Sequence, residues 1–208
     1  YIHHKGKHMD IILSTRNVSK LLQIQGCFAG SPVSILTLND VGVEGEAVED
    51  GKTLEENAIK KALYAKERAG GNFWVMADDT GLFIHALNGE PGVDAAIWAG
   101  TKEETTTAFA LKKLAGLTDR RAAFETVVAV VNPSGEVAVF NGKVEGTMLV
   151  AARVPSQPNM PYSPLFQPIG STKTWAEMTT EEENAISHRG IAFKKVREFL
   201  EEATKQAA

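Results

Sequence analysis

The stretch Asn72–Phe83, NFWVMADDTGLF, places two adjacent aspartates directly after an apolar run. Residues 73–77 have the composition of a buried strand, and Asp78 and Asp79 follow it immediately. A carboxylate in such a place is costly to remove from water unless a cation lies beside it. Oxygen ligands without cysteine or histidine nearby suit Mg²⁺, which is typically shared with substrate phosphates. The alternative is an Asx-turn that ends the strand, because Asp-Asp-Thr-Gly is common in turns.

Strands and helices alternate on both sides of this stretch. The hydrophobic pattern predicts strands at residues 10–15, 33–38, 73–77, 122–131 and 136–146. It predicts helices at residues 17–26, 53–69, 105–115 and 179–203. The last two strands are expected to form a hairpin, because Asn-Pro-Ser-Gly at 132–135 is a turn sequence. Together these elements predict an α/β fold with a mixed sheet.

Capping residues mark the expected ends of the helices. The expected N-caps are Asn17, Thr53 and Thr180. Thr53 and Glu56 also have the spacing of a capping box. The expected stops and breaks are Gly26, Gly70-Gly71 and Gly190.

Composition limits the class of protein. Of 208 residues, 43% are hydrophobic, which is enough for the core of a single domain. The net charge of −4 argues against a nucleic-acid polymer as partner. Cys27 is the only cysteine, so disulfides and cysteine-based metal sites are excluded and a cytoplasmic protein is expected. No apolar run approaches the roughly 20 residues that cross a membrane, so no membrane partner is expected.

The first eight residues are expected to be foreign to the fold. They resemble the remnant of an expression tag, and Met9 is the expected first residue of the natural protein. The histidines of this segment are therefore excluded from any functional interpretation: His3, His4 and His8. Residues 9–208 are predicted to form the single domain.

Polar groups also follow the first predicted strand. The sequence STRNVSK places four of them around the start of a helix: Ser14, Thr15, Asn17 and Lys20. Unpaired N–H groups at a helix N-terminus and a nearby ammonium form an anion site, most simply for phosphate. In open α/β sheets, ligands gather beyond the carboxyl ends of strands. An ordinary capped helix is the alternative.

Two further clusters lie in the C-terminal half. His188 and Arg189, in AISHRG, offer groups suited to the carbonyls of a base or to phosphate. The alternative for this pair is a solvated helix face. Tyr162 and Phe166, in PYSPLF, predict either a stacking platform for a base or a plug in the core.

Four blocks, in this order, resemble the inosine triphosphate pyrophosphatase family of house-cleaning enzymes over nearly all of residues 10–200. STRNVSK is similar to T-G-N-x-x-K, and GKTLEENAIKKA to G-x-T-x-x-E-N-A-x-x-K-A. ADDTGLFIHALNGEPGV is similar to A-D-D-S-G-L-x-V-x-A-L-x-G-x-P-G-V, and NAISHRGIA to N-A-x-S-H-R-x-x-A. The resemblance implies an elongated, twisted mixed sheet flanked by helices in two lobes around a nucleotide cleft. It also implies a homodimer that hydrolyses ITP, dITP and XTP to the monophosphate and pyrophosphate.

The resemblance implies a role for each candidate residue. Asp79 would be the general base and a contact of Mg²⁺, and Asp78 would support the metal. Glu49 is the expected third acidic contact, with Glu46 as the alternative. The implied substrate-binding residues are Ser14, Thr15, Arg16, Asn17, Lys20, Thr80, Tyr162, Ser163, Glu183, His188 and Arg189.

His188 and Arg189 would read the 6-oxo group of a hypoxanthine or xanthine ring. Adenine has an amino group at this position and would leave these donors unpaired. An unpaired buried donor costs about 1–3 kcal/mol, so adenine nucleotides are expected to be rejected.

Departures from the family pattern lie mostly on the base side of the expected site. The family residues Gly, Arg, Asp and Lys are replaced here by Arg16, Ile97, Ser163 and Glu183. Because the metal side is intact, hydrolysis is expected to be retained while the base preference stays open. Two alternatives follow: the same chemistry on another modified nucleotide, or a nucleotide-binding homologue with weak catalysis, since Glu183 would repel phosphate.

Overall fold

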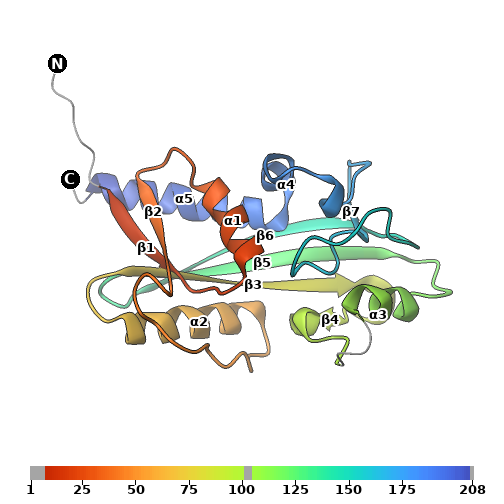
Figure 1. Ribbon diagram of the computed structural model, residues 1–208, viewed down its shortest axis with the longest axis horizontal. Helices are drawn as coiled ribbons and strands as arrows, with labels where there is room; N and C mark the ends of the chain where they lie inside the picture. Colours follow the sequence, from red (N-terminus) through yellow and green to blue (C-terminus); the bar gives the residue numbers. More distant parts are fainter. Residues whose placement is uncertain (1–7, 101–104, 207–208) are drawn as a thin grey trace, which may run out of the picture.

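The computed structural model describes residues 8–100 and 105–206, which form an α/β domain built on one mixed sheet (Figure 1). The strand order is β2-β1-β3-β5-β6-β7, and β4 also pairs with β3. β1 is parallel to β2 and β3, whereas the other pairs are antiparallel. The strands are β1 (Met9–Leu13), β2 (Val33–Thr37), β3 (Trp74–Ile84), β4 (Pro91–Gly92), β5 (Arg121–Val131), β6 (Val137–Met148) and β7 (Phe166–Pro168). The predicted mixed sheet and the hairpin between β5 and β6 are confirmed.

Helices cover both faces of the sheet. In Figure 1, α2 lies on one side of the long strands and α1 and α5 lie on the other. The α-helices are α1 (Val18–Cys27), α2 (Leu54–Ala69), α3 (Thr106–Lys113), α4 (Thr180–Ile186) and α5 (His188–Gln206). The 3₁₀-helices are η1 (His85–Leu87), η2 (Val93–Ala96) and η3 (Trp175–Glu177).

The domain has two lobes. Two hydrophobic clusters lie on opposite faces of the sheet in one lobe, and a third cluster forms the core of the other lobe. Met76 belongs to the cluster between the sheet and helices α1 and α5. Its neighbour Ala77 points the other way, into the cluster beneath α2, because side chains alternate along a strand. Phe166 belongs to a third cluster that includes residues of α3, η2 and η3. β3, β5 and β6 run through both lobes and connect them (Figure 1).

β3 is longer than predicted and contains both aspartates. It spans Trp74–Ile84 rather than 73–77, so the prediction that the strand ends at Asp78 is wrong, as is the Asx-turn alternative. β5 pairs with β3 along almost its whole length, which extends the strand beyond the apolar run. The opposite edge of β3 pairs with β1 before the aspartates and with β4 after Gly81. In the described part of the chain, the aspartates therefore lie at a gap in this edge of the sheet.

The helix ends match the sequence signals in part. Asn17 and Thr53 cap α1 and α2, as predicted. α1 does not stop at Gly26 but continues for one more residue. The capping box at Thr53 is incomplete, because the Glu56 carboxylate accepts a hydrogen bond from the backbone N–H of Lys52 (2.6 Å) instead.

The predicted last helix is in fact two helices. Thr179 caps α4 in place of the expected Thr180, and the chain becomes extended at Ser187 before α5 begins. Gly190 lies inside α5 and does not cause the break. A Cβ atom at Gly190 would collide with the backbone of Asn184 in α4, so glycine is required there by close packing of the two helices.

The N-terminal segment is described only from His8 onward. Residues 1–7 of the expected tag remnant lie outside the described residues. The His8 ring lies 3.3 Å from the hydroxyl of Ser34. Among the helices of the described chain, none has the length and apolar character needed to cross a membrane.

Candidate active site

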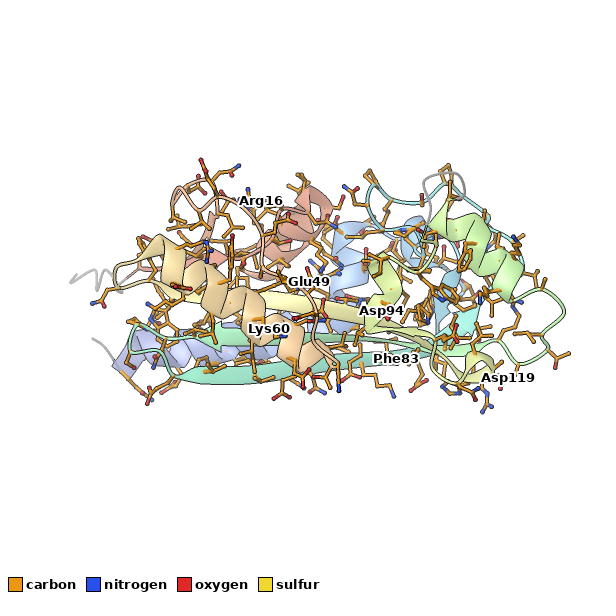
Figure 2. All side chains as sticks on the ribbon, turned by 90° about the horizontal axis from the view of Figure 1, so that it is seen from below. Arg16, Glu49, Lys60, Phe83, Asp94 and Asp119 are labelled. Atoms are coloured by element: carbon orange, nitrogen blue, oxygen red, sulfur yellow. The ribbon has the colours of Figure 1, made fainter. Side chains whose placement is uncertain are left out.

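A cleft of about 750 Å³ lies beside the gap in the edge of β3. It brings together all the metal- and substrate-binding residues that the resemblance implies: Ser14, Thr15, Arg16, Asn17, Lys20, Glu46, Glu49, Asp78, Asp79, Thr80, Tyr162, Ser163, Glu183, His188 and Arg189. Arg16 and Glu49 are labelled in Figure 2, which views the molecule from below. Ile97, in contrast, is exposed and does not line the cleft. The replacement of the family's arginine by Ile97 therefore does not change the lining of the cleft.

Asp78 points to the side of the sheet that carries α1 and α5. One of its carboxylate oxygens, Oδ2, accepts a hydrogen bond from Lys20 Nζ (2.9 Å) and lies 3.8 Å from Arg189 Nε. Burial opposes ionisation, but the surrounding cations, Lys20 first, outweigh it and lower the pKa of Asp78 well below its ordinary value. The other oxygen, Oδ1, is buried and has no hydrogen-bond partner in the part of the chain that the structure describes. Asp78 is therefore an anion with a free acceptor.

Asp79 points to the opposite side, toward α2. Its two oxygens accept hydrogen bonds from Lys61 Nζ (3.0 Å) and Asn57 Nδ2 (3.1 Å). Burial raises the pKa of Asp79, against opposing contributions from Lys61 and Asn57. The two adjacent aspartates thus have pKa values shifted in opposite directions, which is typical of carboxylates with different tasks in one site.

The carboxylates expected to bind a metal are paired with lysines. Lys61 Nζ lies 3.0 Å from Asp79 and 3.1 Å from Glu49, so its ammonium bridges them. Glu46 instead pairs with Arg16 (3.9 Å). Across residues 8–100 and 105–206, no three acidic, histidine or cysteine side chains are grouped as a metal site. The unpartnered oxygen of Asp78 and the all-oxygen donor set do fit a hard cation such as Mg²⁺, which commonly takes one or two carboxylates and completes its shell with phosphate oxygens.

The loop between β1 and α1 forms one wall of the charged end. The Asn17 side chain accepts a hydrogen bond from Lys20 N and so caps α1. Ser14 Oγ donates to the carbonyl of Lys61, which ties this loop to α2. Arg16 donates to the carbonyl of Val43 (2.7 Å), so its guanidinium anchors the loop that follows β2.

Aromatic rings line the other end of the cleft. The His188 ring stacks on Phe124 with centroids 4.8 Å apart. Tyr162 packs edge-to-face on Phe124 and donates its hydroxyl to the carbonyl of Ala95 (2.6 Å). Phe166 lies deep in the third hydrophobic cluster and does not line the cleft, so for this residue the core-plug interpretation holds.

His188 and Arg189 are buried, with 3% and 5% of their surfaces exposed, so the solvated-face alternative is wrong. Burial, assisted by Arg189, lowers the pKa of His188 well below its ordinary value, so the ring is neutral. Arg189 donates to the side-chain oxygen of Gln23 and approaches Asp78. Its guanidinium therefore lies between the charged end of the cleft and α1.

Comparison with known proteins identifies the family. The family model described as the Ham1 family matches residues 11–199. The chain belongs to the Ham1 family. A Thermoanaerobacter pseudethanolicus protein named dITP/XTP pyrophosphatase is 40% identical over 196 residues, covering 92% of this chain and 96% of that protein. Solved Ham1 proteins from Staphylococcus aureus and Coxiella burnetii are each 32% identical, with TM-scores of 0.79 and 0.80, over 93% of this chain and 99% of each solved chain. The resemblance inferred from the sequence blocks is confirmed.

Several residues that line this Ham1-family cleft or support its side chains were not selected from the sequence. Asn57 and Lys61 are spaced four residues apart on α2 and both reach Asp79. A signal was present, because Asn57 lies between Leu54 and Ala58 on the apolar face of a predicted helix, where a polar residue needs a partner. Others carried no such signal: Gln157 and Trp175, which line the cleft, and Gln23, which accepts a hydrogen bond from Arg189.

The neutral state of His188 predicts a pH dependence of stability. The pKa of His188 is lower in the folded chain than its ordinary value of 6.5, so the unfolded chain binds the extra proton. Folding stability contributed by the neutral ring is present above pH 6.5 and is lost as the pH falls, by at most about 1.4 kcal/mol per pH unit. Urea unfolding between pH 8 and pH 5 should show a shallower loss for His188→Gln than for wild type. Equal slopes would contradict this assignment.

Proposed function

We propose that this Ham1-family protein hydrolyses non-standard purine nucleoside triphosphates, ITP, dITP and XTP, to the monophosphate and pyrophosphate in a Mg²⁺-dependent reaction. The observation that carries the proposal is the polarity of the cleft, which has acidic and basic side chains at one end and aromatic rings at the other. A 40% identical relative bears the name dITP/XTP pyrophosphatase.

The separation between the charged and aromatic ends supports a nucleotide that lies along the cleft, with its phosphates at the charged end and its base at the aromatic end. Asp78 pairs across the sheet with Val128, and Leu82 pairs with Phe124. Four residues therefore separate the acidic and aromatic positions, which is about 13 Å along a strand at about 3.3 Å per residue. The even spacing keeps Asp78 and Phe124 on the same face. This separation allows the triphosphate and the base of one nucleotide to occupy different ends.

At the charged end, the chain supplies groups that bind and orient phosphates. Lys20, Lys61 and Arg189 offer ammonium and guanidinium donors, and the N-terminus of α1 adds backbone N–H groups. Asp79 is the proposed general base that accepts a proton from the attacking water. Its hydrogen bonds from Asn57 and Lys61 hold the carboxylate in one orientation.

Asp78, Asp79 and Glu49 are the residues proposed to hold Mg²⁺. When bound, the ion would neutralise charge on the phosphate oxygens. Lys61 already joins Glu49 to Asp79, so a cation is accommodated between these carboxylates.

At the aromatic end, His188 is the proposed reader of the 6-oxo group. Arg189, expected from the resemblance to share this role, lies 3.8 Å from Asp78 and is assigned to the phosphates instead. Its ring is held by stacking on Phe124 and offers one N–H donor in the neutral state. An adenine amino group opposite this donor would leave it unpaired, at about 1–3 kcal/mol. Adenine nucleotides should therefore be poor substrates. The proposal also places the enzyme in the cytoplasm, as expected from its single cysteine, and makes it a homodimer, as the sequence resemblance implies.

Pyrophosphate release from a panel of triphosphates tests the function. ITP, dITP, XTP, GTP, ATP and other base-modified triphosphates are assayed with and without Mg²⁺. We expect turnover of at least one 6-oxopurine nucleotide, dependence on the metal, and roughly 10-fold or greater discrimination against ATP, in line with the cost of an unpaired donor. Tight triphosphate binding by calorimetry without pyrophosphate release would instead support a binding protein with weak catalysis. Selective turnover of a different modified nucleotide would keep the chemistry and change the substrate.

A further inference from the structure

A buried polar wall closes the aromatic end of the cleft. The Gln157 side-chain amide donates both to the carbonyl oxygen of Trp175 and to the carboxylate of Glu183, each at 3.4 Å. All three residues line the cleft, and Trp175 and Glu183 are only 3% and 4% exposed. The wall comes from η3, α4 and the loop before β7, and is thus separate from the loop that follows β1.

Two atoms of this wall are buried without a hydrogen-bond partner among the described residues. They are the indole N–H of Trp175, a donor, and the side-chain oxygen of Gln157, an acceptor. Buried polar atoms in native proteins are almost always bonded, so an unpaired donor and an unpaired acceptor on two residues that line one cleft suggest a partner supplied by a ligand. The Trp175 ring is held in place by stacking on Phe166, with centroids 5.6 Å apart.

Glu183 gives the wall a negative charge. Burial raises its pKa, and Arg189 and the amides of Gln157 and Gln23 oppose this shift by stabilising the carboxylate. A carboxylate accepts hydrogen bonds and cannot donate them. The wall therefore offers one donor, from Trp175, together with acceptors from Gln157 and Glu183.

We propose that Trp175, Gln157 and Glu183 form a second base-reading edge that selects a neutral 6-oxopurine and makes ITP and dITP better substrates than XTP. This inference rests on the proposed function. Hypoxanthine presents a carbonyl oxygen next to a ring N–H, which is an acceptor beside a donor. The indole N–H complements the carbonyl, and the carboxylate and amide oxygens complement the ring N–H.

Xanthine fits this edge poorly for two reasons. Its additional 2-oxo group is an acceptor and would face acceptor oxygens. A xanthine nucleotide also loses a ring proton near neutral pH, so its base becomes negatively charged and meets the charge of Glu183. Specificity built from such repulsion is lost when the repelling group is neutralised.

The test measures kcat/KM for ITP and XTP at pH 8 in wild type, Glu183→Gln and Trp175→Phe. Wild type should favour ITP at least 10-fold. Glu183→Gln keeps the side-chain shape and removes the charge, so the ITP/XTP ratio should fall at least 10-fold. Trp175→Phe keeps the ring and removes the donor, so kcat/KM for ITP should fall about 10-fold, mainly through KM.

Glu181→Gln is the matched control, because Glu181 is exposed on the same helix and loses the same charge. It should leave the ITP/XTP ratio unchanged. A wild-type enzyme that hydrolyses XTP as well as ITP, or a ratio unaffected by Glu183→Gln, would overturn the second base-reading edge while leaving pyrophosphate hydrolysis in place. Absence of pyrophosphate release from every 6-oxopurine triphosphate would overturn both proposals.

Discussion

Replacing Asp79 by asparagine should lower kcat for ITP about 10²–10⁴-fold, the usual contribution of a general base. Asparagine has nearly the same shape, and its side-chain oxygen can still accept the hydrogen bond from Lys61 that is now 3.0 Å long. It cannot take a proton from water at neutral pH. The expected result is a folded protein that binds triphosphate and does not release pyrophosphate.

Asp50→Asn is the matched control for this experiment. Asp50 lies one residue after Glu49, is exposed, pairs with Lys60 and does not line the cleft. Its replacement removes a carboxylate from the same region and should leave kcat within about twofold, since surface ion pairs contribute little. Thermal unfolding and calorimetric binding of ITP should confirm that Asp79→Asn is folded and binds substrate. A folded Asp79→Asn protein with wild-type turnover would exclude Asp79 as the general base.

The sequence was sufficient for much of the fold because its signals are local. Asn17 and Thr53 are side-chain caps whose partners lie three residues away, and both are confirmed. The turn at 132–135 likewise defines its hairpin from within a few residues. The length of β3 could not be predicted in this way, because the strand is extended by pairing with β5 about 50 residues later. For this reason the sequence alone predicted that the strand ends at the aspartate pair.

The candidate site likewise has features that the sequence predicts and features that depend on the packing of distant segments. Ordered motifs selected residues from β1 to α5 that are distant in sequence, and the fold gathers them around one cleft. The ion-pair arrangement could not be predicted, because Lys61 reaches Asp79 only when α2 packs on that face of β3. Gln157 and Trp175 could not be selected either, because their contacts with each other and with Glu183 form only when three distant segments of the chain pack together.

Gly190→Ala should be the most destabilising single substitution of those considered, because it affects the junction that positions His188 and Arg189. An added Cβ atom would collide with the carbonyl oxygen of Asn184 and lie 2.7 Å from its carbonyl carbon. Both are backbone atoms and cannot rotate away, so α4 and α5 must separate. We expect a loss of about 4 kcal/mol, at the upper end of overpacking effects. For a chain of this size, that loss lowers Tm by roughly 8–16 °C.

Gly170→Ala distinguishes this collision from the general cost of replacing glycine. Gly170 has φ +80°, and no atom of residues 8–100 or 105–206 lies within 4 Å of an added Cβ, so alanine there adds only backbone strain of about 1–2 kcal/mol. If close packing of α4 on α5 is what requires glycine at position 190, Gly190→Ala should lose clearly more stability than Gly170→Ala. It should also raise KM for ITP, because His188 would move relative to Phe124. If both variants melt at the same temperature, the close approach of α4 and α5 does not contribute to the stability of the site. Gly142 in β6 also leaves no room for a Cβ atom, which would lie 2.7 Å from the backbone nitrogen of Ala192 in α5. The N-terminal part of α5 is therefore confined by α4 on one side and by β6 on the other. A shift of α5 away from either neighbour should move His188 and so change the base-binding end of the cleft.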